Sequence, residues 1–233
     1  MAREKEIKIL LKISLKDFVK RIQAQGYKLL HTVKQRDIYF DTRDWYLYEN
    51  LTALRLRQVN EMDYSFSFKK LFYLPIKEDR YYIEEIEIKT PFNKVTEFQQ
   101  IFNRLQITYN QEMFKKGRDL ILFLKRHQYF DKQIMPKVRK VYTDGTNEVT
   151  VDDVDQVGVV VELECVNDEP LHLVDTFLSD QEWIRDIEGT SYLWLKKVIG
   201  LTSHLKNLKK FETRPDWNVW DNEIDMYSEI QKD

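Results

Sequence analysis

Short runs in which charged and aliphatic residues alternate are the feature that most constrains the fold of this chain. The first lies in REKEIKILLKIS, from Arg3 to Ser14. Successive side chains of a strand point to opposite faces of its sheet. One face of this run therefore carries Glu4, Glu6 and Lys8, and the other is largely aliphatic. Taken alone, such a run indicates a strand with one solvated face.

The same alternation recurs along the chain, with polar or charged residues on one parity and mostly apolar residues on the other. The recurring polar sets are Arg55 with Arg57, Ser65 with Ser67 and Lys69, Glu85 with Glu87, Lys137 with Arg139, Thr150 with Asp152, and Glu162 with Glu164. Amphipathic helices are also expected, and they need an apolar sheet face to cover. We therefore predict an α+β fold, a closed eight-stranded antiparallel β-barrel with a polar interior and helices packed on its apolar exterior.

Local signals mark where the helices and turns lie. Ser14 is a predicted helix N-cap with Gly26 as the stop signal, and Asp144-Gly145 predicts a hairpin turn. The remaining expected elements are a turn and short strand over 44–52, and helices over 94–105, 111–127, 170–180 and 191–200.

Composition narrows the class of protein. The 233 residues suffice for one substantial domain, with or without an appendage. A net charge of −2 gives no bulk attraction to nucleic acid or to an anionic membrane. Cys165 is the only cysteine, so no intramolecular disulfide forms. Without a signal-like or bilayer-length apolar segment, we expect a cytoplasmic protein.

The charges on the polar parity are too many to be explained by stability, because desolvation costs several kcal/mol per ion. Arginine and lysine suit phosphate oxygens, and carboxylate clusters suit Mg²⁺ or Mn²⁺. The sequence therefore favours a site for a metal-bound polyphosphate. The acids are Glu4, Glu6, Glu85, Glu87, Asp152, Glu162 and Glu164, and the bases are Lys8, Arg55, Arg57, Lys69, Lys137 and Arg139.

Several segments follow one another in an order typical of one known family. They are EKEIK for ExExK, QRDIYFDT for Q-x-D-x-YFDT, ALRLR for LR-[IL]-R, SFSFKK for the strand ending in a tunnel lysine, KVRKVY for K-x-R, VTVDDVDQVGVVVELE for an Asp, a Gly and E-x-E, and GTSYLWL for a SYLELL-type segment. From about Glu4 to about Gly200 the chain thus resembles the CYTH superfamily, the triphosphate tunnel metalloenzymes, which includes class IV adenylate cyclases and thiamine triphosphatases. It departs from the family in two places. The segment usually written T-L-T-L-K contains aromatic residues here, and the middle E-x-E could begin at Glu84 in place of Glu85.

The resemblance implies a role for each charged residue. Lys8, Arg55, Arg57, Lys69, Lys137 and Arg139 would bind the triphosphate; Glu4, Glu6, Asp152, Glu162 and Glu164 would hold Mg²⁺ or Mn²⁺; Lys8, Glu85, Glu87 and Asp152 would serve catalysis. For Lys8, a structural ion pair and an influence on the attacking water are both left open.

The resemblance also implies an activity, and hydrolysis of a triphosphate by water is favoured. The substrate would be inorganic tripolyphosphate, a nucleoside triphosphate or thiamine triphosphate. Alternatives are a class IV adenylate cyclase, a non-catalytic polyphosphate-binding module and a structural protein with solvated charged faces. No nucleic acid or membrane partner is expected, and the oligomeric state, a homodimer among the options, is open. The tunnel domain would span residues 1–200, followed by a helical extension of unknown role over 201–233.

Overall fold

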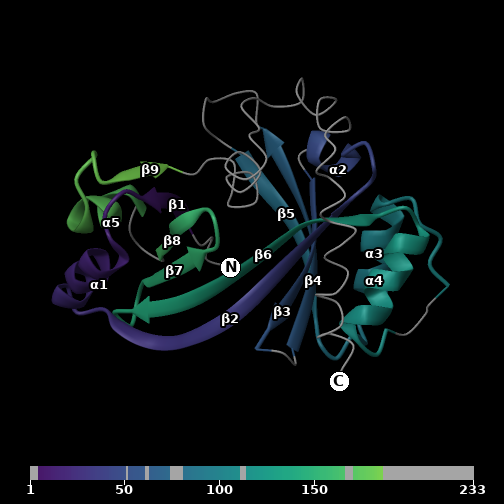
Figure 1. The fold of residues 1–233 in the computed structure, drawn as a ribbon, viewed down its shortest axis with the longest axis horizontal. Helices are drawn as coiled ribbons and strands as arrows, with labels where there is room; N and C mark the ends of the chain where they lie inside the picture. Colours follow the sequence, from purple (N-terminus) through teal and green to yellow (C-terminus); the bar gives the residue numbers. More distant parts are fainter. Residues whose placement is uncertain are drawn as a thin grey trace. The chain divides into compact units, whose positions relative to one another are not determined.

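Antiparallel strands with short helices make up the described part of the chain (Figure 1). The structure, a computed structural model, describes residues 5–50, 52–60, 63–73, 81–110, 114–165 and 170–185. The expected helix over 191–200 and the extension over 201–233 lie outside these residues.

The chain divides into two compact units. Among the described residues, unit 1 comprises 5–35 and those of 135–185, and unit 2 comprises those of 36–134. Strands β2 (Lys28–Asp41) and β6 (Phe130–Thr143) run through both. The other elements of unit 1 are β1 (Lys5–Leu11), α1 (Leu15–Ala24), β7 (Glu148–Val154), β8 (Gly158–Cys165), α5 (Pro170–Phe177) and β9 (Trp183–Arg185). Those of unit 2 are α2 (Tyr46–Glu49), β3 (Thr52–Val59), β4 (Asp63–Tyr73), β5 (Tyr81–Lys89), α3 (Val95–Arg104) and α4 (Gly117–Arg126).

The prediction of a closed eight-stranded barrel is wrong. The described strands form one nine-stranded sheet in the order β5-β4-β3-β2-β6-β7-β8-β1-β9, and the terminal strands β5 and β9 are not hydrogen-bonded to each other. The short strand β9 pairs antiparallel with β1 through Ile9–Leu11, so it occupies the edge of β1 that a closed barrel would use. Alternation along the chain reports which side chains share a face, but it carries no information on which strand edges pair.

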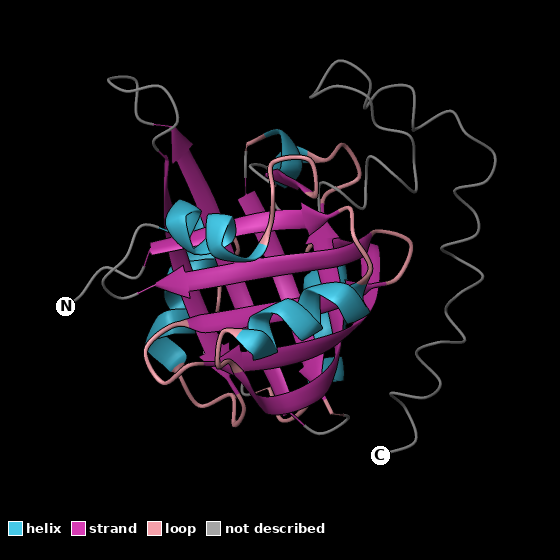
Figure 2. Cartoon of the chain, turned by 90° about the vertical axis from the view of Figure 1, so that its left-hand side faces the viewer, coloured by secondary structure: helices cyan, strands magenta, loops and turns pink. Residues whose placement is uncertain are grey.

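In unit 1 the aliphatic parity lies beneath helices, as predicted. Ile7, Leu163 and Val149 follow one another in register across β1, β8 and β7. They belong to a buried cluster that includes Phe18 of α1 and Phe177 of α5, whose rings meet edge to face with centroids 6.2 Å apart. Figure 2, seen from the side of these helices, shows helices lying in front of strands.

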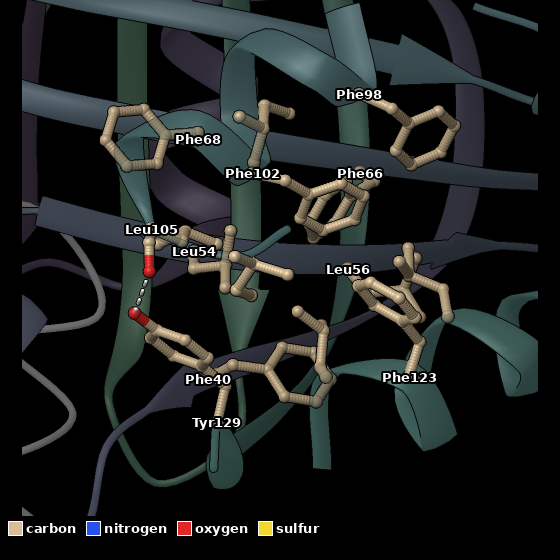
Figure 3. Packing of buried hydrophobic residues seen from close by; sticks show 14 of the residues in the cluster. Phe40, Leu54, Leu56, Phe66, Phe68, Phe98, Phe102, Leu105, Phe123 and Tyr129 are labelled. Carbon is tan, nitrogen blue, oxygen red and sulfur yellow. Dashed lines mark hydrogen bonds between the residues drawn. The ribbon is translucent and has the colours of Figure 1, made fainter. Parts of the chain in front are cut away.

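In unit 2 the apolar parity of β3, β4 and β5 is covered by α3 and α4. Leu56, Phe66 and Ile88 are aligned in register and almost fully buried. Phe66 stacks on Phe98 of α3 with ring centroids 6.0 Å apart. Figure 3 shows this cluster from close by, including the hydrogen bond from the hydroxyl of Tyr129 to the carbonyl of Leu105. The core of unit 2 is therefore rich in aromatic residues, which pack among aliphatic ones.

Local signals placed most of the described helices and turns correctly. Ser14 caps α1, because its Oγ accepts the backbone N–H of Asp17 at 3.1 Å. The hairpin between β6 and β7 turns at Gly145, whose φ of +98° suits glycine. The segment expected to be a turn and short strand is instead the short helix α2. It forms because the buried carboxylate of Asp41 accepts the N–H groups of Leu47 and Tyr48 in its first turn.

Candidate functional site

The charged parity of unit 1 forms a continuous chain of ion pairs, which we call cluster 1. Its members are Lys137, Asp152, Arg139, Glu162 and Lys8. Lys137 Nζ lies 2.7 Å from Asp152 Oδ2, and Arg139 bonds both oxygens of Asp152 at 2.7 Å. Arg139 Nη2 also reaches Glu162 Oε2 at 3.0 Å, and Lys8 Nζ lies 2.9 Å from Glu162 Oε1.

Strand register explains why these five side chains meet. Arg139 of β6 lies directly opposite Asp152 of β7, and Glu162 of β8 lies directly opposite Lys8 of β1. Cross-strand partners on one face have their Cβ atoms within about 5.5 Å of each other. The side chains of Asp152 and Lys137 are 1% and 4% exposed, so cluster 1 reaches well into unit 1.

Glu162 is held as a carboxylate by its neighbours. Burial opposes its ionisation, but the positive charges of Lys8, Arg139 and Lys137 outweigh that effect, and the pKa of Glu162 lies well below its ordinary value. An ionised carboxylate is an acceptor for cations and for hydrogen-bond donors only. Glu162 is therefore available as a ligand for a divalent metal or as a counter-charge for bases.

A second group, cluster 2, lies in unit 2 and comprises Asp37, Arg55 and Arg57. Arg57 forms a bidentate pair with Asp37, through Nε to Oδ1 at 2.6 Å and through Nη2 to Oδ2 at 2.8 Å. The nearest approach of Arg55 to Asp37 is longer, 3.9 Å from Nη1 to Oδ2. Asp37 is only 1% exposed, so its carboxylate fixes Arg57 from beneath.

Sequence reasoning missed Asp37 as a site residue. It lies within QRDIYFDT, a segment noted only as a family motif, on the parity opposite the buried Ile38 and Phe40. The alternation of polar and apolar residues in this segment is the signal that places Asp37 on the polar face.

The remaining predicted residues of unit 2 lie on the same face as cluster 2. Lys69 of β4 is opposite Glu85 of β5, and their side chains form an ion pair at 2.9 Å. Burial opposes the ionisation of Glu87, but a hydrogen bond from Ser65 and the charges of Lys89 and Arg55 lower its pKa below the ordinary value. Both acids thus share their face with bases.

The ambiguity between Glu84 and Glu85 is resolved by the register. Glu84 is opposite Lys70, on the face that carries the apolar residues of β5, and its carboxylate pairs with Arg104 of α3. Glu85 is opposite Lys69 on the polar face. The middle E-x-E pair on the polar face is therefore Glu85 with Glu87.

Two of the predicted metal ligands, Glu4 and Glu6, are described only in part or not at all. Glu4 lies outside the described residues. Glu6 lies directly opposite Glu164 in the pairing of β1 with β8, which places both positions on the face of cluster 1, but the side chain of Glu6 is outside the description. The side chain of Glu164 is half-buried.

The donors of cluster 1 fit a hard divalent cation. The carboxylate oxygens of Asp152 and Glu162, with Glu6 and Glu164 on the same face, are the ligands that Mg²⁺ and Mn²⁺ prefer. Among the described side chains, no group of three or more His, Cys, Asp or Glu forms a ready metal site. Both Asp152 and Glu162 are engaged with bases instead.

Comparison with known proteins identifies the family. The family model described as CYTH domain matches residues 2–190. The chain belongs to the CYTH domain family. This family includes triphosphatases and class IV adenylate cyclases, and its members depend on divalent metals. The resemblance inferred from the sequence is thereby confirmed. No curated protein matches the chain.

Solved structures share the fold at low sequence identity. The PH1819 protein of Pyrococcus horikoshii has a TM-score of 0.56 and 18% identity, with 84% of this chain and 99% of that chain covered. The PH1012 protein of the same organism has a TM-score of 0.55 and 16% identity over 82% and 99%. A candidate adenylate cyclase of Vibrio parahaemolyticus has a TM-score of 0.53 and 17% identity over 82% and 96%.

Membrane insertion through a helix finds no support in the described part of the chain. None of its helices combines the length and the apolar composition needed to cross a bilayer.

Proposed function

We propose that this CYTH protein is a divalent-metal-dependent hydrolase of triphosphates, which releases the terminal phosphate by attack of water. Family membership supports this class of activity. The observation that carries the proposal is cluster 1, in which three bases and two acids form one chain of ion pairs on a sheet face.

Stability alone does not account for such a cluster. Sheltered ion pairs cost several kcal/mol per ion in desolvation, and apolar residues of similar size often stabilise a fold as well or better. A charged ligand would explain these groups, because phosphate oxygens accept hydrogen bonds from the bases and the carboxylate oxygens of the acids coordinate a cation. The arrangement therefore favours binding of a metal-bound polyanion.

In this proposal each cluster, taken by itself, supplies bases that bind phosphate oxygens. Arg57 is held by two hydrogen bonds to Asp37, so its guanidinium keeps a defined orientation on this face. Lys8, Lys137 and Arg139 would exchange part of their contacts with the acids for contacts with phosphate oxygens. Lys69 would likewise exchange part of its contact with Glu85 for contact with a phosphate oxygen.

The metal ligands in this proposal are acids on the face of cluster 1. Asp152 and Glu162 supply carboxylate oxygens, and Glu6 and Glu164 add theirs. Glu4, which lies outside the described residues, is proposed as a further ligand. A bound Mg²⁺ or Mn²⁺ would neutralise charge on the phosphoryl oxygens during transfer.

Orientation of the attacking water is assigned to acids that remain ionised. Glu87 has a lowered pKa, so it accepts hydrogen bonds rather than donating them at neutral pH. Glu85, two residues before it on the same face, shares that role. Lys8 balances the charge of Glu162 and sets how strongly that carboxylate attracts a proton from water.

The second candidate is a class IV adenylate cyclase. The segments QRDIYF and SYLWL favour it, because they resemble the cyclase-like branch of the family. The two reactions differ in which phosphorus is attacked, the terminal one by water or the α-phosphorus by a ribose 3′-hydroxyl.

The experiment is a phosphate-release assay with Mg²⁺ or Mn²⁺ on tripolyphosphate, ATP and thiamine triphosphate, with chromatography of the ATP samples for cyclic AMP. The matched variants are Glu85→Gln and Glu84→Gln. The first removes a charge from the polar face of β5 and the second removes one from the helix-covered face. We expect Glu85→Gln to lower kcat by at least about tenfold and Glu84→Gln to leave it within about twofold.

Each outcome bears on the proposal. Metal-dependent release of phosphate without cyclic AMP supports the proposed hydrolysis. Formation of cyclic AMP and pyrophosphate from ATP would overturn it in favour of the cyclase. Binding of tripolyphosphate without turnover would support the alternative that the protein is a non-catalytic polyphosphate-binding module. Equal effects of the two substitutions would show that the polar face of β5 has no special part in the reaction.

A further inference from the structure

Two serines on the polar face of β4 differ in the state of their hydroxyl groups. Ser65 donates a hydrogen bond to Glu87 and contributes to the low pKa of that acid. Ser67, two residues further along the same strand and on the same face, is fully buried, and its Oγ has no hydrogen-bond partner. A buried hydroxyl without a partner is destabilising, so this group calls for an explanation.

A second unpartnered group lies beside it. Ser67 is directly opposite Arg55 of β3, and the Nε of Arg55 is also buried without a hydrogen-bond partner. The closest contact of Arg55 with Asp37 is 3.9 Å, beyond hydrogen-bonding range, whereas Arg57 bonds the same carboxylate twice. The Nε–H of Arg55 is therefore available to donate to another acceptor.

The two groups are complementary to one kind of ligand. A guanidinium and a hydroxyl both donate hydrogen bonds, and Arg55 brings a positive charge. The acceptor that satisfies both is an anionic oxygen. Both atoms are shielded from solvent, so hydrogen bonds to an oxygen held there are stronger than in water. Glu87, opposite Ser67 on β5, accepts from Ser65 instead.

We propose that Ser67 is a substrate-positioning residue whose hydroxyl donates to the phosphate oxygen that Arg55 binds. The proposal rests on the function proposed above and adds a neutral donor to the charged phosphate ligands. Ser65 is excluded from this role because Glu87 already occupies its hydroxyl.

The test compares Ser67→Ala, Ser65→Ala and Ser67→Thr in the full-length protein. Without ligand, we expect Ser67→Ala to unfold at the wild-type temperature or above it, because the substitution removes an unpartnered buried hydroxyl. Ser65→Ala should unfold at a lower temperature, because it removes a hydrogen bond to Glu87. With tripolyphosphate and Mg²⁺, we expect Ser67→Ala to raise KM by about tenfold, the effect of one hydrogen bond to a charged group. Ser67→Thr keeps the hydroxyl and should restore most of the affinity.

The outcomes separate this inference from the function on which it rests. If the wild-type protein neither binds nor hydrolyses tripolyphosphate, ATP or thiamine triphosphate, the proposed function fails and this role fails with it. If the wild type is active and Ser67→Ala has the wild-type KM, the role of Ser67 alone is overturned. It is also overturned if Ser67→Ala unfolds at a lower temperature than the wild type, as expected of Ser65→Ala, since the hydroxyl then has a partner within the protein.

Discussion

At the scale of single residues, Asp37 organises the arginines of unit 2. Its carboxylate is buried and bonds Arg57 through two nitrogens, which leaves Arg55 with only a longer contact. One acid thus distinguishes a fixed arginine from one whose Nε has no hydrogen-bond partner. The sequence shows the two arginines as equivalent members of a strand, and only the position of Asp37 distinguishes them.

Replacing Asp37 by asparagine should destabilise the protein strongly. The substitution removes the charge that balances Arg57, whose side chain is 13% exposed, and breaking a buried pair from one side costs about 3 kcal/mol or more. Urea unfolding measures the change. Asp153→Asn, at an exposed position of β7, is the control and should unfold as the wild type does. Equal urea midpoints for the two variants would contradict the assigned role of Asp37.

Asp41 and Asp144 show how environment shifts one type of side chain in opposite directions. Burial raises the pKa of Asp41 to about 6, although the N–H groups of Leu47, Tyr48 and Thr42 and the charge of Lys132 oppose the shift. Burial also acts on Asp144, but hydrogen bonds from the N–H groups of Asn147 and Thr146 outweigh it, and its pKa is lowered. The pKa values of the two aspartates shift in opposite directions because Asp41 is buried, at 5% exposed, whereas Asp144 lies in an exposed turn.

The two aspartates should therefore titrate apart. Carboxyl ¹³C NMR is expected to give a midpoint near pH 6 for Asp41 and one below the ordinary range for Asp144. Because the folded state binds the Asp41 proton more tightly than the unfolded state does, the contribution of Asp41 to stability is fully present below pH 4. That contribution is lost as the pH rises through about 6. A midpoint for Asp41 near 4 would show that its burial is not effective.

At the scale of elements, β5 illustrates how a strand serves two functions. Ile86 and Ile88 face the aromatic core beneath α3, while Glu85 and Glu87 lie on the polar face. The helix side of this arrangement depends on Phe98, which is 1% exposed and packs on Phe66. The position of the acids is therefore maintained by the packing on the opposite face.

Truncating Phe98 should loosen this packing. We expect Phe98→Ala to lower the free energy of unfolding by about 3–5 kcal/mol, through lost apolar contact and the cavity left behind. Gln99→Ala, on the exposed side of the same helix, should change it by less than about 0.5 kcal/mol. Chemical denaturation gives both values. Similar effects of the two substitutions would mean that α3 does not cover β4 and β5 as described.

At the scale of the whole molecule, one sheet carries charged groups in each of two units. Cluster 1 lies on β6, β7, β8 and β1, and cluster 2 with Lys69, Glu85 and Glu87 lies on β2 to β5. The expectation that all these side chains surround a single cavity stays a prediction.

Ligand binding should be visible as stabilisation of the folded protein. A triphosphate at one hundred times its Kd adds about 2.7 kcal/mol of stability, so tripolyphosphate with Mg²⁺ should raise the Tm by several degrees. Sulfate at equal ionic strength is the control for non-specific anion effects. Arg139→Ala should reduce the shift, because Arg139 connects Asp152 and Glu162 in cluster 1. A shift of equal size with sulfate would point to a general effect of anions rather than a triphosphate site.

The sequence by itself determined which side chains share a face. Side chains in a strand alternate between two faces, and this period of two residues is a local property. Arg55 and Arg57 could therefore be assigned to one face without a structure, and so could Glu162 and Glu164. Helix caps and the Asp144-Gly145 turn are local as well, and the ordered motifs were enough to indicate the family.

Only the tertiary structure decided what depends on contacts between distant parts of the chain. It placed β9 on the edge of β1 and left the sheet open, where the sequence had suggested a closed barrel. It paired Asp37 with Arg57 and put Glu84, rather than Glu85, beside α3. These features follow from strand order and register, which are set by packing across the fold and leave no local pattern in the sequence.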